Sequence, residues 1–168
     1  MCSRRCCVTL IDRNGLPVTD PWLYQQQDAP LVLAERCVIR LEQWDEYLSQ
    51  FGAPAQGVRI SGEQDPAGVL ALLAQLEVIV IDFAKSRDGR GFTLARLLRD
   101  RHAFAGDLRA AGPLLPDQFS MLLQCGFTSL LAPATVPLVR WQDAARARLQ
   151  AQARPRTLLE RLSLSNEA

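Results

Sequence analysis

The feature that most constrains the fold is a regular alternation of strand-like and helix-like segments from residue 38 onward. β-Branched runs such as Val78–Ile81 are followed by stretches with apolar residues spaced i, i+3 and i+4, such as Leu94, Leu97 and Leu98. Strand–helix units of roughly twenty residues join neighbouring parallel strands by right-handed crossovers. The sequence therefore predicts an α/β fold with about five parallel strands.

The predicted strands cover residues 38–41, 58–60, 78–83, 107–111 and 128–131, and the predicted helices cover residues 42–51, 66–76, 91–104, 115–124 and 141–153. Within residues 8–37, Asn14-Gly15 separates two short apolar runs, a pattern typical of an N-terminal β-hairpin, and residues 20–30 are expected to form a polar connector. We interpret residues 1–168 as one domain, with 1–7 frayed, 38–154 as the strand–helix units and 155–168 as a C-terminal tail. The pattern fits both an open sheet and a partial barrel.

The composition argues against several classes of protein. Hydrophobic residues make up 48% of the chain and charged residues 22%, as in an ordinary soluble domain. No apolar run is long enough to cross a bilayer and no signal-peptide pattern is seen, so we expect a cytoplasmic protein that does not bind membranes. The net charge of +1 provides no overall attraction to nucleic acid.

Motifs for metals and cofactors are not found in the sequence. The five cysteines include no CxxC pair, and His102 is the single histidine. These counts argue against a disulfide framework, a redox pair of cysteines and a histidine-rich metal site. The glycines match neither the dinucleotide-binding nor the phosphate-loop spacing. We therefore predict no metal and no cofactor.

The loop at residues 82–91 carries most of the polar chemistry. It follows the third predicted strand, and the loops that follow parallel strands share the edge of the sheet at which ligands bind. Residues 85–101 hold six basic and two acidic side chains, including Lys85, the only lysine of the chain. Glycines in the loop allow the backbone to approach a ligand closely. The sequence therefore places the candidate site here.

Asp82, Lys85 and Arg90 are the candidate catalytic residues of this loop. Asp82 can serve as a general base or orient the two cations, and the alternative is a structural role as a loop cap or as the partner of an arginine. Arg90 can bind an oxyanion through its forked guanidinium, and the alternative is a structural salt bridge. The residues predicted to contact a ligand at the same edge are Asp88, Gly89, Gly91, Arg109 and Gln118.

Arg96 and Arg99 are spaced i, i+3 on the polar face of the helix that follows the loop. A solvated helix face explains both residues, and a docking surface for an acidic partner is the sharper alternative. Cys125, at the end of the next helix, is interpreted as a small core residue rather than a nucleophile.

Several motifs resemble those of one bacterial family. They are DFxKxxDGRGFTLARLLR at residues 82–99, LRAxG at 108–112, DQ at 117–118 and CGF at 125–127. Together they resemble the pattern of the domain-of-unknown-function 934 family, and the likeness covers about residues 8–132. Ala84, Pro116 and Thr128 depart from the family's usual proline, arginine and aspartate.

Members of this family are often labelled as oxidoreductases with a role in sulfite reduction. The resemblance implies a place in assimilatory sulfur metabolism, with sulfite reductase or another sulfur-assimilation enzyme as partner. We expect an accessory protein or oxidoreductase component that binds a small sulfur oxyanion, or an anionic group of a partner, at the loop 82–91. The alternatives are a noncatalytic module that docks on sulfite reductase through Arg96 and Arg99, and an oxidoreductase that borrows its cofactor.

Overall fold

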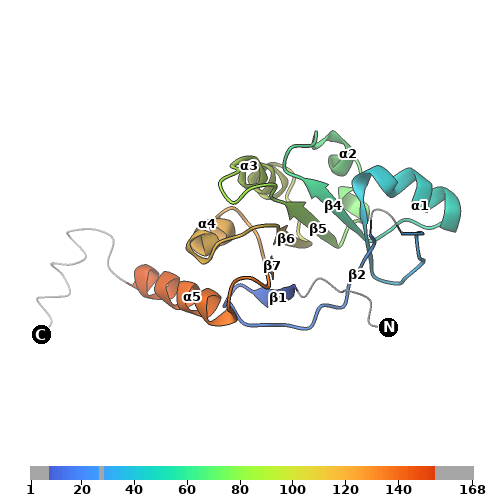
Figure 1. The fold of residues 1–168 in the computed structure, drawn as a ribbon. Helices are drawn as coiled ribbons and strands as arrows, with labels where there is room; N and C mark the ends of the chain where they lie inside the picture. Colours follow the sequence, from blue (N-terminus) through green and yellow to red (C-terminus); the bar gives the residue numbers. More distant parts are fainter. Residues whose placement is uncertain (1–7, 27–28, 154–168) are drawn as a thin grey trace, which may run out of the picture.

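Seven strands form one mixed sheet in the computed structural model, which describes residues 8–26 and 29–153 (Figure 1). The strands are β1 (Thr9–Asp12), β2 (Leu23–Tyr24), β3 (Cys37–Arg40), β4 (Gly57–Ser61), β5 (Val78–Asp82), β6 (Asp107–Ala111) and β7 (Ser129–Ala132). Their order is β1-β7-β6-β5-β4-β3-β2, and every neighbouring pair is parallel except β1 with β7. The predicted α/β class is confirmed. The frayed start predicted at 1–7 and the tail predicted at 155–168 lie outside the described residues.

All five predicted helices are present, and several of them include a turn of different pitch. The helices are α1 (Trp44–Phe51), α2 (Ala67–Leu70), α3 (Arg90–Arg96), α4 (Phe119–Gln124) and α5 (Leu138–Ala153). The adjoining turns are η1 (Leu41–Gln43), η2 (Leu73–Gln75), η3 (Leu97–Arg101) and η4 (Pro116–Gln118), of which η3 has π-helical geometry. None of the helices in the described ranges is long and apolar enough to cross a membrane.

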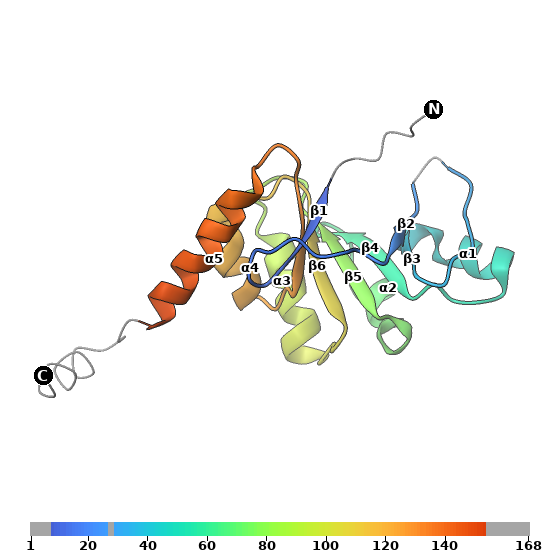
Figure 2. The same ribbon diagram turned by 90° about the horizontal axis from the view of Figure 1, so that it is seen from below.

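The sheet is open and curled like half of a barrel, with the helices on its outer side (Figure 1). Residues 13–22 cross the opposite side of the sheet, which we call the inner side (Figure 2). Successive side chains of a strand point to opposite sides. Ile79 and Ile81 of β5 belong to the large core beneath the helices, whereas Val78 and Val80 belong to a smaller core on the inner side. Asp82 continues the second series, so its side chain falls on the inner side.

The N-terminal hairpin is smaller than the sequence predicts. Its two arms share one antiparallel bridge, between Ile11 and Pro17, and its turn places Gly15 at φ +74°. A β-carbon at this position would lie 2.7 Å from the carbonyl oxygen of Trp141, so the turn also requires glycine for close packing. β1 pairs along its whole length with β7, which satisfies more backbone groups than the hairpin alone. The predicted connector likewise contains the short strand β2, parallel to β3.

Candidate functional site

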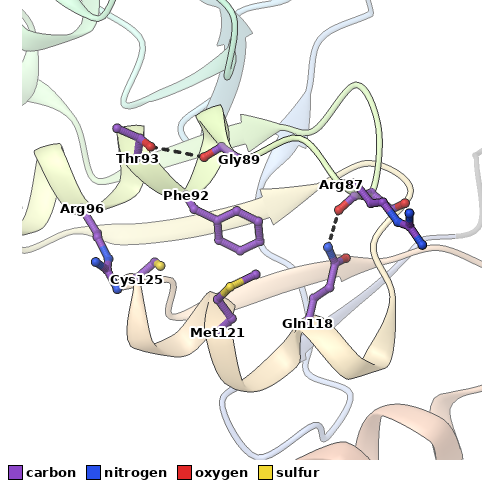
Figure 3. A pocket seen from close by; sticks show the side chains of 9 residues that line it. Arg87, Gly89, Phe92, Thr93, Arg96, Gln118, Met121 and Cys125 are labelled. Carbon is purple, nitrogen blue, oxygen red and sulfur yellow. Dashed lines mark hydrogen bonds between the residues drawn. The ribbon is translucent and has the colours of Figure 1, made fainter.

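The loop 82–91 closes one end of a hollow of about 610 Å³ between α3 and α4 (Figure 3). We call this cavity the α3–α4 hollow. The loop, the two helices and the turn η4 supply its lining residues, which are Ser86, Arg87, Gly89, Phe92, Thr93, Arg96, Gln118, Met121 and Cys125. Gly89 and Gln118 were predicted to contact a ligand at this edge, and both lie in the lining.

Positive charge flanks an apolar centre in the α3–α4 hollow. Arg87 and Arg96 lie at opposite ends, with the ring of Phe92 and the side chain of Met121 between them (Figure 3). Both arginines are exposed, and neither side chain makes a hydrogen bond or ion pair with another described residue. No carboxylate of a described residue lines the hollow. The cavity therefore suits an anion, because guanidinium forks bind oxyanions and the apolar centre can hold a flat or uncharged part of the ligand.

Gln118 fixes the loop against η4. Its side-chain nitrogen donates a hydrogen bond to the carbonyl oxygen of Ser86, and its side-chain oxygen accepts one from the backbone N–H of Leu115 at 3.0 Å. Both polar atoms of this amide are thus engaged within the protein. Gln118 shapes the wall of the hollow, and its predicted contact with a ligand stays a prediction.

The two glycines of the DGRG motif have different surroundings. A β-carbon at Gly91 would lie 2.7 Å from the ring of Phe83, and one at Gly62 would lie 2.8 Å from the backbone nitrogen of Gly91. Gly91 therefore allows the loop to pack against β4 and Phe83. Nothing lies within 4 Å of a β-carbon built at Gly89, which faces the hollow. Gly91 serves the fold, and Gly89 leaves open space for a ligand.

Arg90 does not line the α3–α4 hollow, because carboxylates hold its guanidinium elsewhere. Its Nε and Nη2 donate to the two carboxylate oxygens of Asp88 at 3.0 and 2.9 Å, and Nη2 also meets Glu63. The hydrogen bonds from Arg90, together with the charge of Lys85, hold the pKa of Asp88 below its usual value. Lys85 is exposed and likewise lies outside the lining. Of the two alternatives for Arg90, the structure contains the salt bridge.

Asp82 lies on the inner side of the sheet, away from the hollow. Its carboxylate accepts hydrogen bonds from Nε and Nη2 of Arg59 at 2.6 and 2.7 Å, a bidentate pair that joins β4 to β5. The expectation that Asp82 orients Lys85 and Arg90 is therefore not met in this structure. Its partner is a strand residue whose side chain the alternation of β4 places on the same side.

Arg109 is 3% exposed and also faces the inner side, so it does not join the loop 82–91. Its Nη1 donates to Asp20 at 2.7 Å and to the Tyr24 hydroxyl at 2.5 Å, and its Nε donates to Asp107 at 2.6 Å. Burial disfavours the charge, but the hydrogen bonds to Asp20 and Asp107 outweigh it and raise the pKa of Arg109. Burial also raises the pKa of Tyr24. These contacts fasten the segment that crosses the inner side.

Arg96 and Arg99 do not share one exposed face. Arg96 is exposed at the α3–α4 hollow, whereas Nε of Arg99 donates to the carbonyl oxygen of Gly126 at 2.8 Å and its Nη1 donates to that of Phe104. The α-helical register ends at Arg96, and the wider turn η3 carries Arg99 toward the loop before β7. The predicted docking surface is thus reduced to Arg96.

Two of the three departures from the family pattern named above have local explanations, and nothing in the structure explains the third, Ala84. Pro116 opens η4, a position at which the missing N–H of proline costs nothing. The hydroxyl of Thr128 bonds to Asp107 and accepts a hydrogen bond from the backbone N–H of Leu108 at 2.9 Å. Ala84 is exposed in the loop.

Sequence reasoning missed Arg87, Phe92 and Met121, which line the α3–α4 hollow. The apolar spacing of α4 indicates which side chains face the core, but the hollow arises where α3 and α4 meet, and that contact is nonlocal. Cys125 is buried beneath the hollow, as expected of a small core residue. Among the described residues, no three His, Cys, Asp or Glu side chains are grouped so that they could hold a metal ion.

Comparison with known proteins assigns the chain to a family. A search of curated proteins found no match. Residues 57–155 match the family model described as bacterial protein of unknown function, DUF934. The match spans more than half of the chain and includes the loop 82–91, α3, η4 and α4, which together form the α3–α4 hollow. The chain therefore belongs to the DUF934 family of bacterial proteins.

Proposed function

We propose that this protein binds a small oxyanion of sulfur, or an anionic group of a partner protein, in the α3–α4 hollow, as an accessory protein or oxidoreductase component of assimilatory sulfite reduction. The observation that carries the proposal is the pair Arg87 and Arg96, which flank the hollow without a protein partner among the described residues. The connection with sulfite reduction rests on the family resemblance. The sequence pointed to Arg90 and Arg109 as the anion-binding arginines, but both are paired with carboxylates. The proposal therefore uses Arg87 and Arg96 instead.

The arrangement suits recognition of an anion. Each guanidinium can offer two parallel N–H donors to two oxygens of a sulfite or sulfate ion. Gly89 leaves the approach along the loop open, since no atom lies within 4 Å of the position of its missing β-carbon. Phe92 and Met121 form the apolar centre between the two arginines.

Sulfite titration followed by NMR tests the proposal. The amide signals of Gly89 and Thr93 report on the α3–α4 hollow, so binding elsewhere on the protein does not enter the result. We expect both signals to shift with sulfite, and Arg96→Gln to weaken the binding about tenfold, as expected for a lost charge-assisted hydrogen bond. Arg101→Gln is the matched control, because Arg101 is exposed on η3 and lies outside the lining. Equal binding by the two variants would exclude the hollow as the anion site.

A second candidate function is docking on a partner enzyme through the same opening. It is favoured by the exposure of Arg87 and Arg96 next to Met121, which is 45% exposed, and Leu115, which is 43% exposed. Arginine and methionine are enriched at protein interfaces. Co-purification with sulfite reductase that fails after Arg96→Glu but survives Arg101→Glu would support this function. Loss of the complex in both variants, or in neither, would count against it.

A further inference from the structure

A second, smaller hollow lies at the end of the sheet where the parallel strands begin, whereas the loop 82–91 lies at the end where they finish. Its volume is about 260 Å³, and it opens beside the residues that lead into β7. Three elements that are far apart in sequence each bring one arginine to it: Arg13 from the turn after β1, Arg99 from η3 and Arg148 from α5. We call it the three-arginine hollow. No carboxylate of a described residue lines it.

Arg99 is held rigidly in this hollow. Its Nε donates to the carbonyl oxygen of Gly126 at 2.8 Å, its Nη1 donates to that of Phe104, and its guanidinium carbon lies 5.5 Å from the centre of the Phe104 ring. Its third nitrogen, Nη2, is buried and has no hydrogen-bond partner among the described residues. The side chain is therefore fixed in place at the wall of the hollow.

Nε of Arg148 is also buried, and no residue in the described ranges accepts a hydrogen bond from it. Burial lowers the pKa of Arg99, and the nearby positive charge of Arg13 lowers it further. The negative charge of Asp107 raises this pKa, but by less than burial lowers it. Asp107 makes no ion pair with the three arginines of the hollow, and its carboxylate accepts hydrogen bonds from Arg109 at 2.6 Å and Ser129 at 2.9 Å. Three like charges thus meet around a hollow that no carboxylate of a described residue lines.

Like charges that gather around one hollow repel one another, and a bound anion offsets this repulsion and accepts hydrogen bonds from the guanidinium groups. From this geometry we propose that the three-arginine hollow binds a tetrahedral oxyanion, sulfate or phosphate, either as the free ion or as a terminal group. The hollow has room for such a group. This site is separate from the α3–α4 hollow and does not depend on the function proposed for it.

Calorimetric titration with sodium sulfate and with sodium phosphate tests the assignment, at an ionic strength held constant with sodium chloride. The protein carries Arg87→Gln and Arg96→Gln, so that the α3–α4 hollow does not contribute. In this background, Arg148→Gln removes one guanidinium of the hollow and leaves the backbone contacts of Arg99 intact. Arg140→Gln is the matched control, because Arg140 is exposed on the same helix and lines neither hollow.

We expect sulfate or phosphate to bind in the background protein and in the Arg140→Gln variant, and to bind about tenfold more weakly after Arg148→Gln. Arg13→Gln is a second variant, at an exposed position, and it should weaken binding in the same direction. A preference for one ion would distinguish a sulfate site from a phosphate site. Heats that sodium chloride reproduces, or equal affinities of Arg148→Gln and Arg140→Gln, would overturn the proposal.

Discussion

The inner side of the sheet and the α3–α4 hollow use arginine in opposite ways. On the inner side, Arg109 meets two carboxylates and the bidentate pair of Arg59 with Asp82 joins neighbouring strands. At the hollow, Arg87 and Arg96 make no contact with a carboxylate among the described residues. The difference separates arginines that hold the fold together from arginines that can bind a ligand, although both kinds occur in the most distinctive motifs of the sequence.

The largest effect is expected where an inner-side arginine is removed. Arg109→Ala leaves Asp20 and Asp107 without their buried cation and should lower the free energy of unfolding by roughly 3–5 kcal/mol. Urea denaturation measures this loss. Arg146→Ala, which removes an exposed ion pair with Asp143, is the control and should cost less than about 1 kcal/mol. A similar small cost for both variants would remove the distinction between the two regions.

The two glycines of the DGRG motif also differ in whether they serve the fold or leave room for a ligand. Gly91→Ala places a methyl group 2.7 Å from the ring of Phe83 and should destabilise the protein by roughly 1–3 kcal/mol. Gly89→Ala adds the same group in open space, so its stability should stay within about 0.5 kcal/mol of the wild type. The unfolding temperatures of the two variants measure this difference in stability. If Gly89→Ala proves the more costly, the loop does not have the packing described here.

A smaller effect on the free energy of unfolding is expected at acid pH, from the titration of Asp107. Burial favours the protonated form of Asp107, but hydrogen bonds from Thr128 and Arg109 outweigh burial and lower its pKa. A group whose pKa is lowered on folding adds stability above its unfolded value, and that stability is lost as the pH falls below about 4. The wild type should therefore lose stability more steeply in this range than Asp107→Asn. Unfolding curves at several pH values test this, and parallel losses would contradict it.

The sequence predicted the fold class well because the alternation of strands and helices is a local signal. It could not predict that β1 pairs with β7, since that contact joins the two ends of the fold. It also missed β2, whose two residues carry almost no pattern of their own.

The candidate site was predicted less well. Residues that follow parallel strands at one edge of the sheet were expected to have side chains that point to the same place, and they do not. The alternation of β5 already places Asp82 on the same side as Val78 and Val80, and this signal was available in the sequence. The position of Arg99 could not be predicted, because it depends on the change from α to π geometry after Arg96.

The central claim is that the arginines that line a hollow without a carboxylate partner mark the anion sites of this protein. Its most direct test is a crystal structure of the protein grown with selenate, whose anomalous scattering locates the bound ion. The account predicts a selenate at Arg87 or Arg96 in the α3–α4 hollow and a second in the three-arginine hollow, with none at Arg59 or Arg109. Selenate at the paired arginines, or at neither hollow, would contradict it.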